Sequence, residues 1–161
     1  MTNLGSSILV VDDTKFRSTI IAKALAKSGY RDIRIANDAI TALNMLDQRR
    51  TSVLIADWLM PEIDGLELTQ RVRQTDEQNN HFTYVILLTA KEGSSALKEA
   101  FDKGIDDFIF KSEMSKQLLP RVFAADRMAD RQNAMLSANQ LLMENTRQLE
   151  NRNIIDLETG V

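Results

Sequence analysis

The chain has 161 residues, 43% of them hydrophobic, which is enough for one well-cored domain and an appendage but hardly for two domains. Its 20 basic and 23 acidic residues give a formal net charge of −3, which argues against direct nucleic-acid binding or a polybasic membrane surface. The absence of cysteine excludes disulfides, zinc–cysteine sites and thiol catalysis. Residues 1–7 do not resemble a signal peptide, and no apolar run is long enough to cross a bilayer. We therefore expect a cytoplasmic protein.

Five short runs rich in β-branched and aromatic residues follow one another along the chain. Each is apolar almost throughout, which is typical of strands buried on both faces of a sheet. We expect strands at residues 8–12, 33–36, 53–57, 84–89 and 106–110.

Segments with helical spacing of apolar residues lie between these strands. The expected stripes are Phe16, Ile20 and Ala24, then Ala39, Leu43 and Leu46, then Leu66, Thr69 and Val72, and finally Ala96, Ala100 and Phe101. Gly29 and Gly104, each just before a strand, are expected to end helices. Regular alternation of strand and helix predicts an α/β fold, a doubly wound five-stranded parallel sheet with helices on both faces.

Polar residues stand at the ends of four of these strands: Asp12 and Asp13, Asp57, Thr89 and Lys111. Ligands of open parallel sheets bind beyond the carboxyl ends of the strands. Three carboxylates there would repel one another unless a cation compensates, and oxygen-only ligands with room for water favour Mg²⁺. A lysine and a threonine hydroxyl at the same edge suit a phosphoryl group, with one carboxylate as its nucleophile.

Each of these residues also has a simpler interpretation. Aspartates at strand ends are common in turns and helix caps, and 12–14 could merely start the first helix. That explanation fits one residue well and five residues at one edge poorly. Asp64 and Gly65 are better explained as turn residues, and Trp58 and Met60 as packing or partner-facing residues. His81, in a polar loop, is expected to be solvated.

Over roughly Ser7 to Phe123 the chain resembles a response-regulator receiver domain of two-component signalling, which has a flavodoxin-like fold. The resemblance rests on the full set of motifs rather than on any one. They are the pair Asp12 and Asp13, Asp57 followed by "MPEIDG", Thr89 in "LLTA", and Phe108 three residues before Lys111.

By this resemblance Asp57 is the phosphoacceptor, which receives a phosphoryl group from a sensor histidine kinase or phosphotransfer protein. Asp12 and Asp13 would hold Mg²⁺ together with Asp57 and the backbone carbonyl of Leu59. The protein would then be a signalling phosphoacceptor that catalyses only its own phosphotransfer and dephosphorylation.

The resemblance also implies a switch. Thr89 and Lys111 would bind the phosphoryl group, and movement of the Thr89 hydroxyl would accompany inward rotation of Phe108. Such domains usually have a cis proline after the lysine, whereas Ser112 follows Lys111 here. Either this peptide is cis at a cost of about 2.5–4 kcal/mol, or it is trans and the next helix starts differently.

The C-terminal stretch has no glycine or proline from Arg121 to Asp156, which as one helix would extend about 54 Å. Read as heptads, apolar residues fill d, polar residues fill a, and further apolar residues widen the stripe at e. The d positions are Met128, Met135, Leu142 and Leu149, the a positions include Asn139, and the e positions are Ala129, Leu136 and Met143. We expect a marginal coiled coil that forms a homodimer, ahead of the alternative in which the helix folds back on its own domain.

The last residues, "DLETGV", resemble the segment that opens GGDEF diguanylate cyclase domains, with matches at Asp156, Thr159 and Gly160. The expected organisation is a receiver domain at 1–123, a signalling helix at 124–155 and the start of an output domain at 156–161.

Two other function classes are open. One is a receiver-like dimerisation module that works without phosphorylation, which would suit a chain that had lost its acceptor or lysine, whereas both are present here. The other is a haloacid-dehalogenase-type Mg²⁺ phosphatase, which needs a second aspartate two residues after the nucleophile, where this chain has Leu59.

Overall fold

The computed structural model describes residues 5–90 and 93–158, with side chains placed as far as residue 151. The five strands form one parallel sheet in the order β2-β1-β3-β4-β5, which confirms the predicted fold. The strands are β1 (Ser7–Val11), β2 (Asp32–Ala36), β3 (Val53–Asp57), β4 (Tyr84–Thr89) and β5 (Asp107–Phe110). The helices are α1 (Lys15–Lys27), α2 (Ala39–Gln48), α3 (Gly65–Asn79), α4 (Ser94–Asp102), the 3₁₀ turn η1 (Lys111–Glu113) and α5 (Met114–Glu158).

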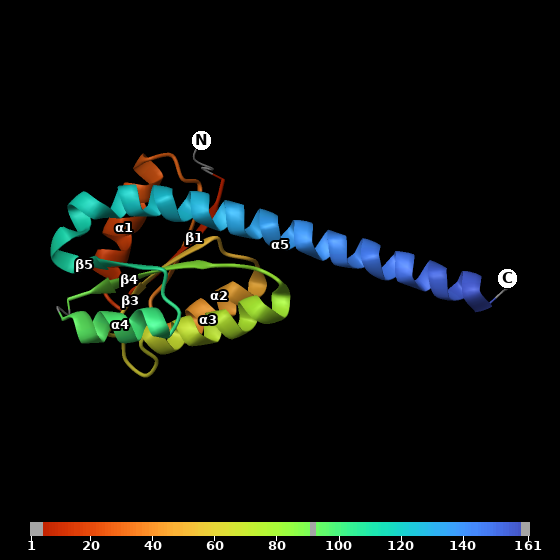
Figure 1. Cartoon of the computed structure of the whole chain (residues 1–161). Helices are drawn as coiled ribbons and strands as arrows, with labels where there is room; N and C mark the ends of the chain where they lie inside the picture. Colours follow the sequence, from red (N-terminus) through yellow and green to blue (C-terminus); the bar gives the residue numbers. More distant parts are fainter. Residues whose placement is uncertain (1–4, 91–92, 159–161) are drawn as a thin grey trace.

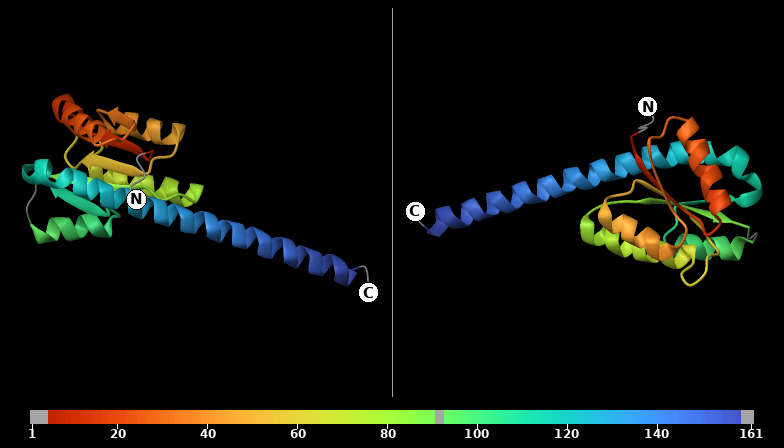
Figure 2. Two further views of the ribbon diagram at one scale, coloured as in Figure 1. Left: turned by 90° about the horizontal axis from the view of Figure 1, so that it is seen from above. Right: turned by 180° about the vertical axis from the view of Figure 1, so that it is seen from behind.

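Helices cover both faces of the sheet, with α1 and α5 on one face and α2, α3 and α4 on the other (Figure 1). Successive residues of a strand point to opposite faces, so the central strands supply two cores. In β1, for example, Val10 packs towards Ile21 of α1 and Val122 of α5, whereas Val11 packs towards Ala39 of α2 and Leu68 of α3. Figure 2 shows the same three layers from two further directions.

The edge strands differ from the prediction. Burial on both faces holds for β3 and nearly all of β1 and β4, but only Ala36 of β2 and Ile109 of β5 are fully buried. Edge strands of a twisted sheet are covered less completely by the helices, so their residues remain half-exposed.

The stripe expected in α1 is wrong by one position. Phe16 and Ile20 have exposed fractions of 76% and 44%, and the helix instead buries Ile21 and Leu25 against the sheet. Phe101 of α4 is likewise 43% exposed. In the other helices the expected stripes are buried or half-buried, most completely at Ala39, Leu66, Thr69, Val72 and Ala100.

The two glycines predicted to end helices do so. Gly29 and Gly104 have φ angles of 105° and 112°, a left-handed conformation that glycine adopts without steric cost. Their amides donate to the carbonyls of Ala26 and Phe101.

Helix α5 is continuous through Pro120 and runs well beyond the sheet (Figure 1). Its first half packs on the sheet through Leu118, Val122 and Ala125. The alternative in which the helix packs on its own domain holds for its part up to Gln140, which contacts the loop before β4, but not for residues 141–151, which are all exposed. None of the described helices is long and apolar enough to cross a membrane.

Polar side chains fix the direction in which α5 leaves the domain. The buried Asp126 accepts hydrogen bonds from Ser6 and Tyr30. Two turns further on, the Asn133 amide accepts from the backbone N–H of Phe82 at 2.8 Å and donates to its carbonyl at 2.9 Å. The side chain of Asn80 donates to Gln140 at 2.9 Å. These contacts hold α5 over the loop between α3 and β4.

Candidate functional site

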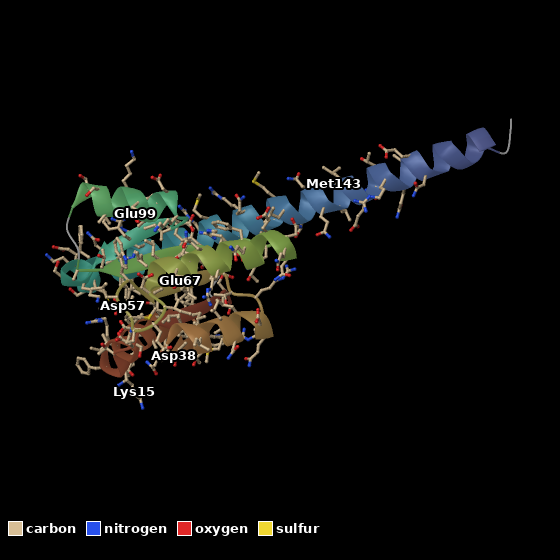
Figure 3. All side chains as sticks on the ribbon, turned by 90° about the horizontal axis from the view of Figure 1, so that it is seen from below. Lys15, Asp38, Asp57, Glu67, Glu99 and Met143 are labelled. Carbon is tan, nitrogen blue, oxygen red and sulfur yellow. The ribbon has the colours of Figure 1, made fainter. Side chains whose placement is uncertain are left out.

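The topology brings the predicted site residues to one edge of the sheet. Asp57 is the last residue of β3 and Thr89 the last of β4, while Asp12 directly follows β1 and Lys111 directly follows β5. These four strands are consecutive neighbours, so their carboxyl ends lie side by side. Figure 3 shows Asp57 at the end of the molecule where Lys15 begins α1, far from Met143 on α5.

Three carboxylates cluster there. Asp12, Asp13 and Asp57 each offer an oxygen, and these oxygens all lie within 4.8 Å of one another. Asp12 and Asp57 are buried, and Asp13 is exposed. Asp12 also accepts from the backbone N–H of Thr14 at 2.8 Å, so the simpler interpretation of this residue as a turn former is correct as well.

Two cations balance part of this charge. The Lys111 ammonium lies 2.7 Å from Oδ1 of Asp57. The Arg17 guanidinium lies 3.1 Å and 3.3 Å from the two carboxylate oxygens of Asp12 and 3.6 Å from Oδ2 of Asp57. Both cationic side chains are partly exposed, whereas the carboxylates they meet are buried.

Burial raises the pKa of Asp57 above its ordinary value, and the Lys111 ammonium opposes that effect. The charge of Asp12 raises this pKa further, and Arg17 lowers it. The buried Oδ1 of Asp57 receives no well-directed hydrogen bond, so its contact with Lys111 is an ion pair. The three carboxylate oxygens of Asp12, Asp13 and Asp57 fit a hard divalent cation such as Mg²⁺. The buried Oδ1 of Asp57, which lacks a hydrogen bond, is consistent with this.

The two predicted switch residues lie on neighbouring strands. Asp57 pairs with Leu88, so the buried Thr89 lies one residue further along the same edge. The Phe108 ring is half-buried on the α4 side of the sheet, and its centroid lies 6.0 Å from the ring of Phe101. Phe108 therefore already touches α4.

The loop after Asp57 is built as predicted, from turn and packing residues. The side chain of Asp64 caps α3 by accepting from the backbone N–H groups of Leu66 and Glu67, at 3.0 Å and 2.9 Å. At Gly65, a Cβ atom would lie 2.4 Å from the carbonyl oxygen of Asp57. Trp58 is buried in the core, with Met60 against it.

The remaining predicted residues lie at the surface. Leu59, two residues after Asp57, has an exposed fraction of 55%. The d-position side chains of α5 are also more than half exposed, namely Met128, Met135, Leu142 and Leu149, and Asn139 is exposed with them. The peptide between Lys111 and Ser112 is trans, and Lys111 opens the 3₁₀ turn that leads into α5.

Arg17 is the site residue that the sequence reasoning missed. Helical spacing gives no signal for this contact, because Arg17 reaches Asp12, five residues earlier, and both Asp12 and Asp13 precede α1.

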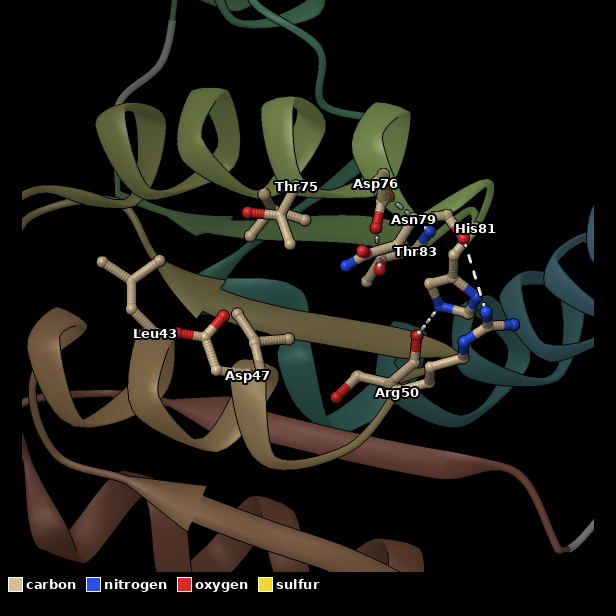
Figure 4. A pocket seen from close by; sticks show the side chains of 11 residues that line it. Leu43, Asp47, Arg50, Thr75, Asp76, Asn79, His81 and Thr83 are labelled. Atoms are coloured by element: carbon tan, nitrogen blue, oxygen red, sulfur yellow. Dashed lines mark hydrogen bonds between the residues drawn. The ribbon is translucent and has the colours of Figure 1, made fainter.

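A second hollow lies between α2 and α3, at the opposite end of the strands (Figure 4). His81 lines it and is half-buried rather than solvated, with Nε2 2.8 Å from the carbonyl oxygen of Thr51. The neighbouring Asp76 is buried and accepts from the backbone and hydroxyl of Thr83. His81 and Asp76 are thus engaged with neighbouring groups of the protein.

The family model described as the response regulator receiver domain matches residues 8–123, well over half of the chain. This chain belongs to that family. Receiver domains are signalling modules rather than classical enzymes, and phosphorylation and Mg²⁺ binding at the acidic pocket are general properties of the family.

Relatives support this assignment of the receiver. Response regulator MprA of Mycobacterium leprae is 32% identical over 117 residues, which cover 73% of this chain and 49% of the relative. MprA of Mycobacterium ulcerans is 31% identical over 134 residues, or 83% of this chain and 51% of the relative. The chain thus spans about half the length of the curated relatives it matches.

Solved receiver structures agree with the fold. The chemotaxis protein CheY4 of Vibrio cholerae superposes with a TM-score of 0.64 at 26% identity, covering 73% of this chain and 98% of CheY4. The receiver domain of the histidine kinase CKI1 from Arabidopsis thaliana, solved with Mg²⁺ and BeF₃⁻, gives a TM-score of 0.64 at 25% identity. That match covers 74% of this chain and 90% of the CKI1 domain.

Proposed function

We propose that this receiver accepts a phosphoryl group on Asp57 from the phosphohistidine of a sensor histidine kinase or phosphotransfer protein. A carboxylate oxygen of Asp57 attacks phosphorus, the new O–P bond forms as the P–N bond breaks, and the electron pair of that bond returns to the imidazole. The observation that carries the proposal is the convergence of Asp12, Asp13 and Asp57 with Lys111 at one edge of the sheet.

The acidic pocket would hold Mg²⁺ through Asp12, Asp13, Asp57 and the backbone carbonyl of Leu59. When bound, the ion supplies positive charge that stabilises the developing charge on the phosphoryl oxygens. The Lys111 ammonium already lies 2.7 Å from Oδ1 of Asp57, which suits it to pair with a phosphoryl oxygen held on that carboxylate.

The phosphoryl group would then bias a two-state element. The hydroxyl of Thr89 would donate a hydrogen bond to a phosphoryl oxygen, and Phe108 would rotate inward as that hydroxyl moves. The contact between Phe108 and Phe101 supports this step, because rotation of Phe108 changes the packing of α4.

We also propose an output. Residues 1–123 form the receiver, residues 124–155 form a signalling helix, and two copies of the chain pair through this part of α5. Its support is the exposed apolar stripe of Met128, Met135, Leu142 and Leu149, with Asn139 at an a position. A single helix rarely keeps such a stripe in water, and a second copy of the chain would cover it.

The attached output domain that we propose is a diguanylate cyclase. Its support is the match of the sequence after residue 155 to the opening of that domain at Asp156, Thr159 and Gly160. Thr159 and Gly160 lie outside the described residues. Sequencing the gene past the codon for Val161 tests this step, and a different output motif there would overturn it.

The acceptor is tested with acetyl phosphate as donor and intact-mass spectrometry as readout. The wild-type chain should gain one phosphoryl group in Mg²⁺ and none in EDTA. Asp57→Asn should gain none, whereas Asp47→Asn, an equal change at an exposed position on α2, should behave as wild type. Labelling of Asp57→Asn at the wild-type rate would refute the assignment.

The second candidate is a dimerisation module that works without phosphorylation. The exposed stripe on α5 favours it equally, since that stripe needs no signal to pair. A dimer that is unaffected by an aspartyl-phosphate mimic would support this alternative. The phosphatase alternative has no such observation, because the position two residues after Asp57 is the exposed Leu59.

A further inference from the structure

Arg17 occupies the acidic pocket itself. One guanidinium nitrogen, Nη1, lies 3.1 Å from Oδ2 and 3.3 Å from Oδ1 of Asp12, and 3.6 Å from Oδ2 of Asp57. A single donor group thereby bridges two buried carboxylates from neighbouring strands. These are two of the three carboxylates whose oxygens gather within 4.8 Å of one another.

A guanidinium in that position and a divalent cation need the same oxygen atoms. The three carboxylates carry three negative charges, and Lys111 and Arg17 contribute two positive charges. A divalent ion added without any other change would leave the pocket with a net positive charge and would stand against the Arg17 guanidinium. Like charges at such short range repel strongly where water is partly excluded.

The Arg17 guanidinium can leave the pocket for solvent. The Arg17 side chain is 28% exposed and stands on the first turn of α1, where Lys15 and Phe16 are also exposed. A long side chain at the rim of a pocket can turn into solvent without disturbing the core. Lys111 approaches Asp57 through its other oxygen, Oδ1, so it can stay in place when Arg17 leaves Oδ2.

We propose that Arg17 is a built-in competitor of the divalent cation: its guanidinium neutralises Asp12 and Asp57 in the metal-free protein and must leave before Mg²⁺ binds. The inference rests on the proposed function, since it concerns the metal site of the same phosphoacceptor. Arg17 thereby weakens Mg²⁺ binding and sets the Mg²⁺ concentration at which the receiver becomes competent. It also stabilises the metal-free fold, in which the two buried carboxylates would otherwise repel each other.

The test is a Mg²⁺ titration of the full chain followed by the fluorescence of Trp58, the only tryptophan, which is buried next to Asp57. Isothermal calorimetry gives an independent dissociation constant. Arg17→Met removes the charge and keeps much of the side-chain length. Arg17→Lys keeps the charge but loses the planar group that spans two carboxylates.

Arg71→Met is the matched control. Arg71 stands on α3, and its guanidinium makes an exposed pair with Glu67 at 3.4 Å. The substitution Arg71→Met therefore removes the same charge from the protein without changing the pocket. Far-ultraviolet circular dichroism of every variant establishes that each is folded before its titration is compared.

Arg17→Met should bind Mg²⁺ about tenfold more tightly than wild type, which corresponds to about 1.4 kcal/mol. Arg17→Lys should lie between the two, and Arg71→Met should match wild type. In EDTA, Arg17→Met should melt at a lower temperature than wild type, and saturating Mg²⁺ should close that gap. The melting temperature is a second readout that does not depend on fluorescence.

Equal Mg²⁺ affinity in wild type and Arg17→Met would overturn the competition while leaving the metal site intact. An equal gain in Arg71→Met would also overturn it, because net charge rather than position would then explain the effect. No Mg²⁺ binding by either wild type or Arg17→Met would instead refute the metal site of the proposed function.

Discussion

Asp57 is an ionisable group at the end of a buried strand, and its neighbours act on its charge in opposite directions. Burial and the charge of Asp12 raise its pKa, while Lys111 and Arg17 lower it. The sequence predicted the carboxylates and Lys111 from their positions at strand ends. It could not predict the balance between these effects, because that depends on distances across the sheet that spacing along the chain does not contain.

This balance predicts how Asp57→Asn changes stability in metal-free solution. The folded-state pKa of Asp57 lies above its ordinary value of 3.8, so its ionised form is disfavoured by folding. Below that ordinary value the group is protonated in both states and costs nothing. As the pH rises through the folded-state pKa, wild type loses stability that the neutral asparagine does not lose.

Asp57→Asn should therefore be more stable than wild type at neutral pH, with the advantage shrinking as the pH falls towards 3.8. Urea unfolding in EDTA across this range measures the difference. A variant that is less stable than wild type at neutral pH would show that Lys111 outweighs burial.

Gly65 is a second residue whose role depends on close packing, because its backbone lies against Asp57 and Leu87. A Cβ atom there would lie 2.4 Å from the Asp57 carbonyl oxygen and 2.8 Å from Cδ1 of Leu87, so Gly65→Ala must displace the backbone of Asp57. Overpacking of this kind costs about 1–3 kcal/mol. We expect that loss in urea unfolding, together with slower labelling by acetyl phosphate. Wild-type stability and labelling would mean that the loop absorbs the methyl group freely.

At the scale of elements, strands and helices were easier to predict than the faces they bury. The apolar spacing of α1 suggested a stripe through Phe16 and Ile20, yet the helix packs through Ile21 and Leu25. Both stripes are apolar, and only the position of the helix on the sheet decides between them. The docking of α5 could not be predicted from the sequence either, because Asn133 hydrogen-bonds to the backbone of Phe82, 51 residues away in the chain.

The contact of Asn133 predicts how firmly α5 is held. Asn133→Ala removes both hydrogen bonds to the backbone of Phe82 and leaves that N–H and carbonyl to water. We expect a loss of about 1–2 kcal/mol and faster amide exchange in α5 beyond residue 133. Asn151→Ala, at an exposed position of the same helix outside the predicted seam, should leave both quantities unchanged. Equal effects of the two variants would mean that the contact of Asn133 with Phe82 does not help to hold α5.

At the scale of the whole molecule, Asp57 and the free part of α5 lie at opposite ends of the protein (Figure 3). The heptad pattern predicted a long helix, and the helix is present. Pairing of two such helices stays a prediction, because a repeat in sequence specifies an apolar face and not what covers it. In the proposed switch the signal would start at Phe108 on β5, whose ring packs against Phe101 on α4.

The pairing can be tested on α5 itself with two adjacent leucines. Leu142 lies at a d position and Leu141 at the neighbouring c position, with exposed fractions of 63% and 61%. Leu142→Glu should weaken the dimer at least tenfold, because it places charges against each other in the seam. Leu141→Glu should leave it almost unchanged. Light scattering over a range of concentrations measures both, and equal weakening would refute the heptad register.

The most direct measurement is sedimentation velocity of the full chain in Mg²⁺, with and without beryllofluoride as a mimic of the aspartyl phosphate, in wild type and Asp57→Asn. If phosphorylation of Asp57 controls assembly through α5, beryllofluoride should shift wild type from monomer towards dimer and leave Asp57→Asn unchanged. Identical sedimentation of wild type in both conditions, or the same shift in Asp57→Asn, would contradict that control.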